Sequence, residues 1–347
     1  SDGDVHGVKD SANKQSAYWG TMRCVMPELP EVSRNIVNPT APVTGTVVTS
    51  EVCLKGGRKS ASFVRHVAID VSGTPLEGQL QPGQSFGVIP PGEDEKGKPH
   101  KVRLYSVASP SWGEGGKGAV ISTTPKRVID EYTPQKEGDD EDRHDLFLGV
   151  CSNYLCDVKV GDKVQVSGPA GKRFLLPVDR NAHDYVFMAT GTGIAPFRSM
   201  CMELFDHPNG PTTSQVHVVM GAPYTTDLLY DDLFQGYAEN HENFHYYTAI
   251  SRELQADGSK GLYVGQVIEQ HLDEVFGPIL SSDRGLLYLC GLIGMQFGVY
   301  KMLAARGLSD AYMTINGEAR EIDSEDWTRE QMRRYVRPSE RMMVEVY

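Results

Sequence analysis

The chain has 347 residues, 39% hydrophobic and 23% charged, a composition typical of a globular protein with room for two separate cores. Its formal net charge of −12 argues against nucleic acid as the main partner, because phosphates bind to basic surfaces. No apolar run approaches the roughly 20 residues that a membrane-spanning helix needs, so no transmembrane segment is predicted.

The six cysteines contain no C-x-x-C pair, so the sequence indicates neither a zinc site nor an iron–sulfur cluster held by this chain. Unpaired cysteines are typical of a reducing compartment, and we expect a cytoplasmic protein. The polar N-terminal segment also lacks the charged start and apolar core of a secretion signal.

Residues 1–42 are predicted to form a polar arm that carries several prolines. From residue 43 short β-type runs, separated by Gly, Pro and Asp, follow at 44–53, 62–71, 85–89, 102–108, 119–123, 146–150 and 163–167. Because most of these runs have no helical pattern between them, they predict an antiparallel β-barrel domain over residues 43–182. A stretch rich in Pro, Gly and charge at 169–183 ends that domain.

From residue 183 to residue 347 the pattern changes to alternating strands and helices. Strands are predicted at 185–189, 216–220, 245–249, 286–290 and 342–347, and helices at 196–205, 228–240, 264–275, 295–306 and 324–335. This alternation predicts an α/β domain with a doubly wound parallel sheet. Ligands of such sheets bind beyond the carboxyl ends of the strands.

A candidate diphosphate site follows the first of these strands. The small-residue turn TGTG at 190–193 leads directly into a helix whose first turn holds Pro196, where a missing N–H costs nothing. Free backbone N–H groups and the positive end of the helix dipole would face an anion here. A tight connection without a ligand is the alternative interpretation of this turn.

Two barrel segments are also suited to binding a nucleotide. Alternation along residues 103–106 puts Arg103 and Tyr105 on one face, where a guanidinium and a phenol can hold an anion and stack on a flat ring. Residues 149–156 (GVCSNYLC) offer small donors before a helical turn, with Ser152 or Asn153 as the predicted cap. Taken alone, Arg103 and Tyr105 fit an ordinary exposed edge strand better than a binding site, and residues 149–156 are also compatible with an ordinary capped helix start.

Taken together, the motifs resemble those of the plant-type ferredoxin–NADP⁺ reductase family. The motifs occur in the family's order from about residue 43 to the last residue: RLYS at 103–106, GVCSNYLCD at 149–157, GPAG at 168–171, GTGIAPFR at 191–198, SR at 251–252, CGL at 290–292 and VEVY at 344–347. The resemblance implies an FAD-binding barrel, an NADP(H)-binding α/β domain, and FAD-mediated electron transfer between NADP(H) and ferredoxin or flavodoxin.

The resemblance assigns a set of residues to FAD. Arg103 would pair with the pyrophosphate, Tyr105 and Tyr347 would cover the two faces of the isoalloxazine, and Ser106 would lie beside its N5 atom. The full set of FAD-binding residues that it implies is Arg103, Tyr105, Ser106, Lys126, Tyr132, Val150, Cys151, Ser152 and Tyr347.

A second set is implied for NADP(H) and for catalysis. Thr192 would lie near the pyrophosphate, Ser251 and Arg252 would bind the 2′-phosphate, and Tyr263 would stack on the adenine. The implied catalytic residues are Ser106, Cys290, Glu345 and Tyr347.

The sequence departs from the family pattern in two places. The family has a basic residue just before the position of Tyr263, where this chain has Gly261 with Lys260 beside it. The family's aromatic partner for the FAD adenine directly follows a Lys-Arg pair, whereas four residues separate Lys126-Arg127 from Tyr132 here.

The resemblance also implies a carrier partner, ferredoxin or flavodoxin, that docks near the lysines Lys96, Lys98 and Lys101 of a monomeric enzyme. The compartment would be the cytoplasm or, alternatively, the plastid stroma. A second hypothesis is a flavin reductase component of an oxygenase or haem system with a separate acceptor protein. A third is a nucleotide-binding regulatory module without turnover.

Overall fold

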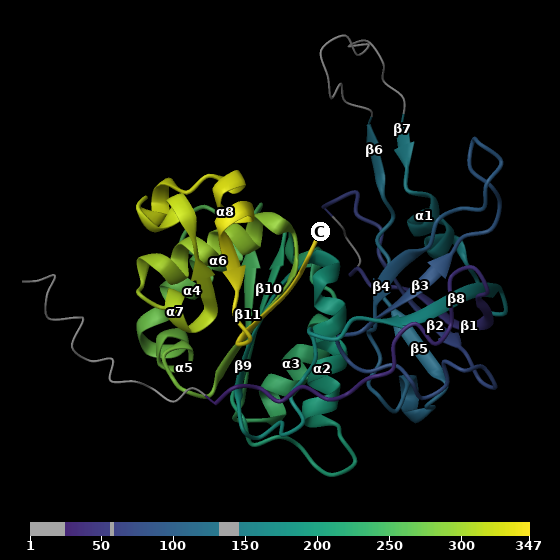
Figure 1. Cartoon of the computed structure of the whole chain (residues 1–347), viewed down its shortest axis with the longest axis horizontal. Coiled ribbons are helices and arrows are strands. Elements are labelled where there is room, and N and C mark those ends of the chain that lie inside the picture. Colours follow the sequence, from purple (N-terminus) through teal and green to yellow (C-terminus); the bar gives the residue numbers. More distant parts are fainter. Residues whose placement is uncertain (1–24, 56–58, 132–145) are drawn as a thin grey trace, which may run out of the picture.

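The computed structural model describes residues 25–55, 59–131 and 146–347. Figure 1 shows two bodies side by side, a β-rich one built from the first half of the chain and an α/β one built from the second half. The predicted fold class, an antiparallel barrel domain followed by a doubly wound parallel sheet, is confirmed. The exact domain limits, at residues 42/43 and 182/183, stay a prediction.

The first body is a six-stranded antiparallel sheet with the order β4-β3-β8-β1-β2-β5. Its strands are β1 (Val43–Val52), β2 (Arg65–Asp70), β3 (Ser85–Ile89), β4 (Arg103–Ser106), β5 (Val120–Thr123) and β8 (Lys163–Ala170). Fully buried side chains such as Ile69, Leu76 and Phe86 fill the interior. All six correspond to predicted runs, because each run alternates or is continuously apolar as a half-buried or buried strand requires.

Two further strands, β6 (Ile129–Glu131) and β7 (Leu146–Leu148), form a hairpin that projects from the barrel (Figure 1). The strand predicted at 146–150 is therefore too long, because helix α1 (Val150–Asp157) begins at Val150. The expected cap is also wrong: the N-cap is Gly149, and both Ser152 and Asn153 lie inside the helix. A side chain at Gly149 would force its neighbours to shift, because its Cβ would lie 2.9 Å from Val128 Cβ.

The second body is a five-stranded parallel sheet with the order β11-β10-β9-β12-β15. Its strands are β9 (Asp184–Thr190), β10 (Val216–Ala222), β11 (Phe244–Ile250), β12 (Gly285–Gly291) and β15 (Met342–Val346). The helices around it are α2 (Ala195–Phe205), α3 (Asp231–Asn240), α4 (Val264–Gln270), α5 (Gly277–Leu280), α6 (Ile293–Ala305), α7 (Ser309–Tyr312) and α8 (Arg329–Tyr335). A small two-stranded sheet of β13 (Met313–Ile315) and β14 (Val336–Pro338), which the sequence patterns did not predict, lies beside them.

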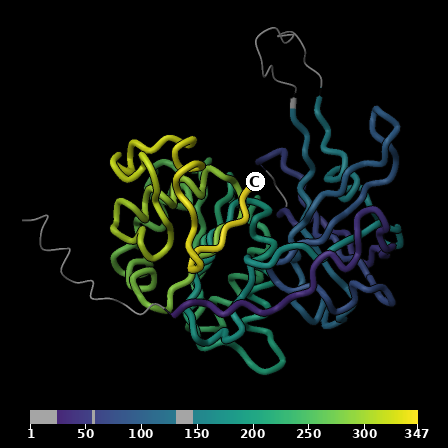
Figure 2. The backbone as a smooth tube through the Cα atoms, in the orientation of Figure 1, coloured from purple at the N-terminus to yellow at the C-terminus, as the bar shows by residue number. Residues whose placement is uncertain are grey.

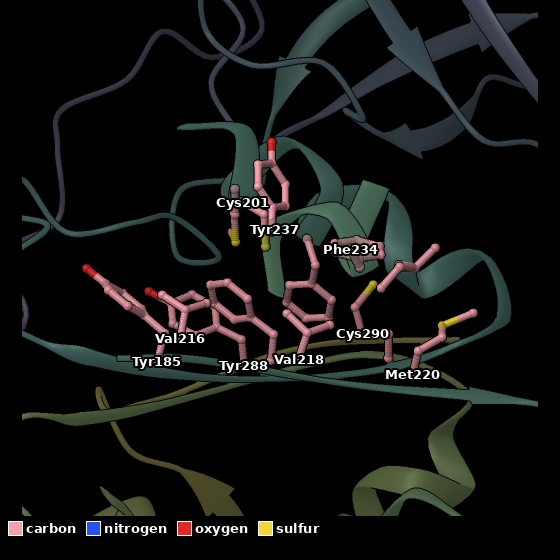
Figure 3. Packing of buried hydrophobic residues seen from close by; sticks show 14 of the residues in the cluster. Tyr185, Cys201, Val216, Val218, Met220, Phe234, Tyr237, Tyr288 and Cys290 are labelled. Atoms are coloured by element: carbon pink, nitrogen blue, oxygen red, sulfur yellow. The ribbon is translucent and has the colours of Figure 1, made fainter. Parts of the chain in front are cut away.

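Each face of the parallel sheet has its own hydrophobic core. Along β9, Tyr185 and Phe187 belong to the core on the α2 and α3 side, whereas Val186 and Met188 belong to the core on the α4, α6 and α8 side. Figure 3 shows the first core, with Tyr185 and other strand side chains opposite helix residues. A continuous apolar run results because alternate side chains enter two different cores.

Several predicted helices begin or break at other residues. The helix predicted at 228–240 begins at Asp231, because Tyr230 has a left-handed backbone with φ 56°. The helix predicted at 324–335 is divided into a short 3₁₀ turn and α8, whose first turn is capped by Thr328 Oγ1 accepting from the Gln331 N–H at 3.2 Å. The helix predicted at 264–275 ends at Gln270, where a π-helical turn follows.

The described part of the N-terminal arm crosses both bodies, as the purple trace shows in Figures 1 and 2. Val25 N–H donates to Asp283 O in the α/β body, and Val37 pairs with Gly168 at the end of the barrel. No helix among the described residues is both long and apolar enough to span a bilayer.

Because His217 on β10 is buried, we expect the stability of the fold to decrease in acid. Its ring is 3% exposed and stacks on His245 at 4.3 Å. Burial, with His245 as a lesser cause, lowers the pKa of His217 to about 3. Because the folded pKa lies below the unfolded value of about 6.5, stability is complete above pH 6.5 and is lost as the pH falls toward 3.

We expect wild-type protein to lose about 2 kcal/mol of unfolding free energy between pH 7 and pH 5 through this group, at ~1.4 kcal/mol per pH unit below 6.5. His217→Gln should remove most of that loss in urea unfolding curves recorded at both pH values. His271→Gln, an exposed residue of the same aromatic stack, is the control. Equal pH dependence of wild type and His217→Gln would contradict the assignment.

Candidate functional site

A cavity of about 1290 Å³ lies between the barrel and the carboxyl ends of the parallel strands. It is larger than the roughly 300–1000 Å³ of most single-ligand pockets, so it has room for more than one nucleotide-sized molecule. The sequence-predicted site residues that line it are Arg103, Tyr105, Ser106, Lys126, Val150, Cys151, Ser152, Thr192, Ser251, Arg252, Tyr263, Cys290, Glu345 and Tyr347. Tyr132, the remaining one, lies outside the described residues.

Strand β4 forms one wall of the cavity. It is the edge strand of the barrel sheet and pairs only with β3 within the described chain, which leaves Arg103 exposed and Tyr105 half-buried. The Arg103 guanidinium donates to its neighbour's carbonyl, Val102 O, at 3.1 Å and has no carboxylate partner among the described residues. Burial raises the pKa of the Tyr105 phenol, so this ring stays neutral. The wall therefore offers a flat uncharged ring beside a guanidinium that no described carboxylate neutralises.

The first turn of α1 forms the adjoining wall. Gly149, Val150, Cys151 and Ser152 all line the cavity, and the first N–H groups of a helix have no partner within it. Ser152 Oγ donates to Gly149 O at 3.1 Å and accepts from the Val128 N–H at 3.2 Å, which fixes the turn against the barrel. Backbone donors and the positive helix end at this wall suit an anionic group.

The turn after β9 forms the opposite side. Gly191–Ile194 is a 3₁₀ turn that leads into α2, with Pro196 in the first turn of the helix as predicted. Gly193 is required because a Cβ would lie 2.1 Å from Cys290 O. Thr192 Oγ1 lies 2.9 Å from Tyr347 Oη, so the turn and the chain end are in direct contact. The turn is therefore free of side chains where it packs on β12.

The end of the chain lies between the two bodies (Figures 1 and 2). Parallel pairing of β12 with β15 puts Glu345 beside Cys290, and the Tyr347 N–H donates to Gly291 O at 2.9 Å. The Tyr347 ring is 63% exposed, although it borders the cavity. A large aromatic ring left exposed at a cavity wall can stack on a flat ligand.

Burial raises the pKa of the Glu345 carboxyl to about 7. Burial, together with the neighbouring Glu345, raises the pKa of the Cys290 thiol, which is therefore a neutral group rather than a thiolate nucleophile. The pair offers a carboxyl that holds or releases a proton near neutral pH, next to an uncharged thiol.

Ser251, Arg252 and Tyr263 line the far end of the cavity, beyond β11 and at the start of α4. The Tyr263 ring is 69% exposed, and the exposed Arg252 is held through its backbone N–H, which donates to Pro223 O at 2.9 Å. A side chain at Gly261 is excluded, because its Cβ would lie 2.5 Å from Ile250 O. This packing explains physically why no basic residue stands at that position.

The sequence patterns did not single out Phe147 in β7, which is 61% exposed and lines the cavity. The sequence feature that could have identified it is an aromatic residue within the run at 146–150, whose pattern predicts only a strand. Arg127, the neighbour of Lys126, does not line the cavity. Its guanidinium pairs with Asp157 and donates to Asn153 Oδ1 at 2.9 Å. Lys101 also lines the cavity, whereas Lys96 and Lys98 do not.

Comparison with known proteins agrees with this geometry. A family model described as an oxidoreductase NAD-binding domain matches residues 187–301. The chain is 38% identical over 346 residues to a ferredoxin–NADP reductase of Picosynechococcus sp., covering 97% of this chain and 78% of the relative. It is also 38% identical over 278 residues to root isozyme 1 of the chloroplastic enzyme of Arabidopsis thaliana, covering 79% and 70%.

Among solved structures, ferredoxin-NADP⁺ reductase from Plasmodium falciparum superposes with a TM-score of 0.62 at 21% identity, covering 90% of this chain and 99% of that one. This likeness extends the match in fold to both bodies. From the extent and identity of the cyanobacterial and plant matches, the chain belongs to the ferredoxin–NADP reductase family.

Proposed function

We propose that the cavity is the place where this oxidoreductase carries out electron transfer between NADP(H) and ferredoxin through FAD. As a family member the chain is an enzyme that uses these two cofactors. The observation that carries the proposal for the site is the meeting of Tyr105 from the barrel and Tyr347 from the chain end at one cavity. Two such rings suit a flat redox group between them.

The barrel side fits FAD. Arg103, with a guanidinium that lacks a carboxylate partner among the described residues, would bind the pyrophosphate with the first turn of α1. Tyr105 would pack on one face of the isoalloxazine, and Ser106 would orient its edge. We infer that Phe147 or Lys126 faces the adenine, since an aromatic ring and a long side chain among the lining residues can pack on a base. When bound, FAD supplies the exchange between two-electron hydride transfer and one-electron transfer.

The sheet side fits NADP(H). The turn Gly191–Ile194 would hold the pyrophosphate, Arg252 and Ser251 the 2′-phosphate, and Tyr263 the adenine. Cys290 would orient the nicotinamide, because its neutral thiol lines the cavity at the end of β12, opposite Glu345. Tyr347 would exclude water from the isoalloxazine face until the nicotinamide displaces its ring. The Glu345 carboxyl would hold or release a proton at its Oε atoms near pH 7.

The carrier protein would approach the barrel side of the cavity. We propose ferredoxin, with flavodoxin as an alternative carrier, docking against Lys96, Lys98 and Lys101. The backbone N–H groups of Lys96 and Lys98 donate to Asp94 Oδ1 at 2.9 and 3.0 Å, which holds this loop in a turn, and Lys101 reaches the cavity wall. An acidic carrier would bind here through salt-sensitive contacts.

We further propose a monomer, in the cytoplasm or alternatively in the plastid stroma. The relatives that support these two compartments are a cyanobacterial enzyme and chloroplastic isozymes. A reductase that serves an oxygenase or haem system is the second candidate function, since the same cavity would serve another acceptor. A regulatory module without turnover is disfavoured by the ionisable and neutral groups gathered at the cavity, Glu345 and Cys290.

The decisive experiment is anaerobic reduction of the FAD-loaded protein by NADPH, followed by addition of purified ferredoxin or flavodoxin. We expect rapid carrier reduction that slows as ionic strength rises. Failure of both carriers, with direct reduction of an oxygenase component instead, would favour the second function. Absence of any NADPH-driven reduction would contradict the proposal.

Glu345 gives a prediction about protonation. The protonated carboxyl C=O stretch should disappear between pH 6 and pH 8 in difference infrared spectra of the holoenzyme, because burial raises its pKa to about 7. Glu345→Gln should abolish this band change. Glu340→Gln, an exposed glutamate just before the same strand, should leave it intact. A band that titrates below pH 5 would refute the buried, raised-pKa carboxyl.

Arg252 gives a prediction about cofactor choice. Arg252→Ala should raise KM for NADPH by about 10- to 100-fold, since a charge-assisted contact contributes about 1.5–3 kcal/mol. KM for NADH, which lacks the 2′-phosphate, should change less than about twofold on the same reasoning. Lys260→Ala, whose side chain does not line the cavity, is the matched control. Steady-state kinetics with both nucleotides measures this, and equal losses for NADPH and NADH would remove the assignment.

A further inference from the structure

The two bodies are joined by a buried ion pair that the proposed chemistry does not use. Arg198 on α2 donates to Glu114 on the barrel side, through Nη2 to Oε1 at 2.7 Å and Nη1 to Oε2 at 3.0 Å. The same Nη1 donates to Ala108 O at 2.6 Å. The side chains of Arg198 and Glu114 are only 12% and 20% exposed. The guanidinium therefore holds two separate barrel segments to one helix.

Three consecutive hydroxyl residues at the end of β5 extend this contact in both directions. Ser122 Oγ donates to Glu114 Oε2 at 2.7 Å, and Thr123 Oγ1 donates to Ser106 O at 2.8 Å. Thr124 Oγ1 lies 2.6 Å from Tyr230 Oη, which belongs to the α/β body. One strand end thus connects the backbone of Ser106, a cavity residue, to both Arg198 and Tyr230.

Tyr230 contacts the barrel from an unusual backbone conformation. Its φ of 56° is left-handed, and Asn35 is the one other non-glycine residue with positive φ in the described part of the chain. Its Oη also lies 2.9 Å from His66 Nδ1 on β2, and the Arg198 guanidinium lies 5.1 Å from the Tyr230 ring centroid. A conformation of this kind persists only where its surroundings hold it in place.

A buried polar contact of this sort is a poor source of stability, because an apolar replacement of similar shape can be equally stable. It is, however, directional, since each bond fixes a distance and an angle. The contact also lies close to both halves of the cavity: Ala108 follows Ser106 by two residues, and Arg198 lies one helical turn beyond the Gly191–Ile194 turn.

We propose that Arg198 and Tyr230, with Glu114 and Thr124, form an interdomain clamp that positions Ser106 against the Gly191–Ile194 turn. Both residues are positioning residues and touch neither ligand. The inference rests on the proposed function, in which groups held by the two bodies must meet within the cavity. Because a misplacement of about 1 Å can cost roughly 100-fold in rate, loosening the clamp should slow hydride transfer more than it weakens nucleotide binding.

Tyr230→Phe removes one hydroxyl and keeps the ring. In the FAD-loaded enzyme we expect kcat for NADPH oxidation with ferricyanide to fall by about 5- to 20-fold, below the 100-fold limit of a 1 Å shift, with KM for NADPH within about twofold. Tyr300→Phe is the matched control, because Tyr300 is also buried and hydrogen-bonded, to Gln296 within α6. Arg198→Lys should lose less kcat than Arg198→Met, since a lysine keeps the charge.

Hydrogen–deuterium exchange provides a readout that does not depend on turnover. In Tyr230→Phe and Arg198→Met holoenzyme, amides at 106–109 and 191–195 should exchange faster, whereas those in β10 should not. A double variant of Tyr230→Phe with Thr124→Val should lose no more kcat than Tyr230→Phe alone, because the hydroxyl that Thr124 contacts is already absent from the single variant.

Wild-type kcat and unchanged exchange in Tyr230→Phe would overturn the clamp, and so would equal kcat losses in Tyr230→Phe and Tyr300→Phe. If wild-type enzyme shows no NADPH-driven turnover, the proposed function fails, and the exchange pattern alone then decides whether the clamp holds the two bodies. If Arg198→Met does not fold, Tyr230→Phe alone supports or overturns the clamp by the same two measurements.

Discussion

The parallel pairing of β15 with β12 is the interaction on which the site depends. Strand β15 is the last strand of the chain. Its register with β12, Cys290↔Glu345, therefore places the final residues at the carboxyl edge of the sheet, facing the barrel. Tyr347 is then held by Gly291 O and contacts Thr192 on the turn after β9. Without that pairing the cavity would lack its aromatic cover and its buried carboxyl, and the barrel wall with Tyr105 would face solvent.

The two sides of the cavity are built by opposite means. On the sheet side, backbone segments pack directly against each other. At Gly193 the carbonyl of Cys290 occupies the space that a side chain would need. The barrel side is formed by an edge strand and the start of a helix. Within the described chain, Arg103 has no carboxylate partner there, and the first N–H groups of α1 have no partner within the helix. Between them lies a polar interface centred on Arg198. Apolar cores stabilise each body, while directional hydrogen bonds set how the bodies meet.

Local signals account for what the sequence predicted correctly. The run at 185–189 predicts a strand buried on both faces, and the glycines at 191 and 193 predict a tight turn before a helix, since both depend on neighbouring residues alone. Local signals also misled: Ser152 and Asn153 are good caps by type, yet the N-cap of α1 is Gly149 and both residues lie inside the helix. Phe147 and Tyr230 could not be assigned from sequence, because their roles come from contacts with segments far away in the chain.

The central claim is that one flat redox ring lies between Tyr105 and Tyr347. A crystal structure of the protein purified with its yellow cofactor tests this most directly. We expect electron density for an isoalloxazine between those two rings, with the pyrophosphate beside Arg103 and the first turn of α1. Density for the flavin at any other place, or a cavity that binds nucleotide only at the turn after β9, would contradict it.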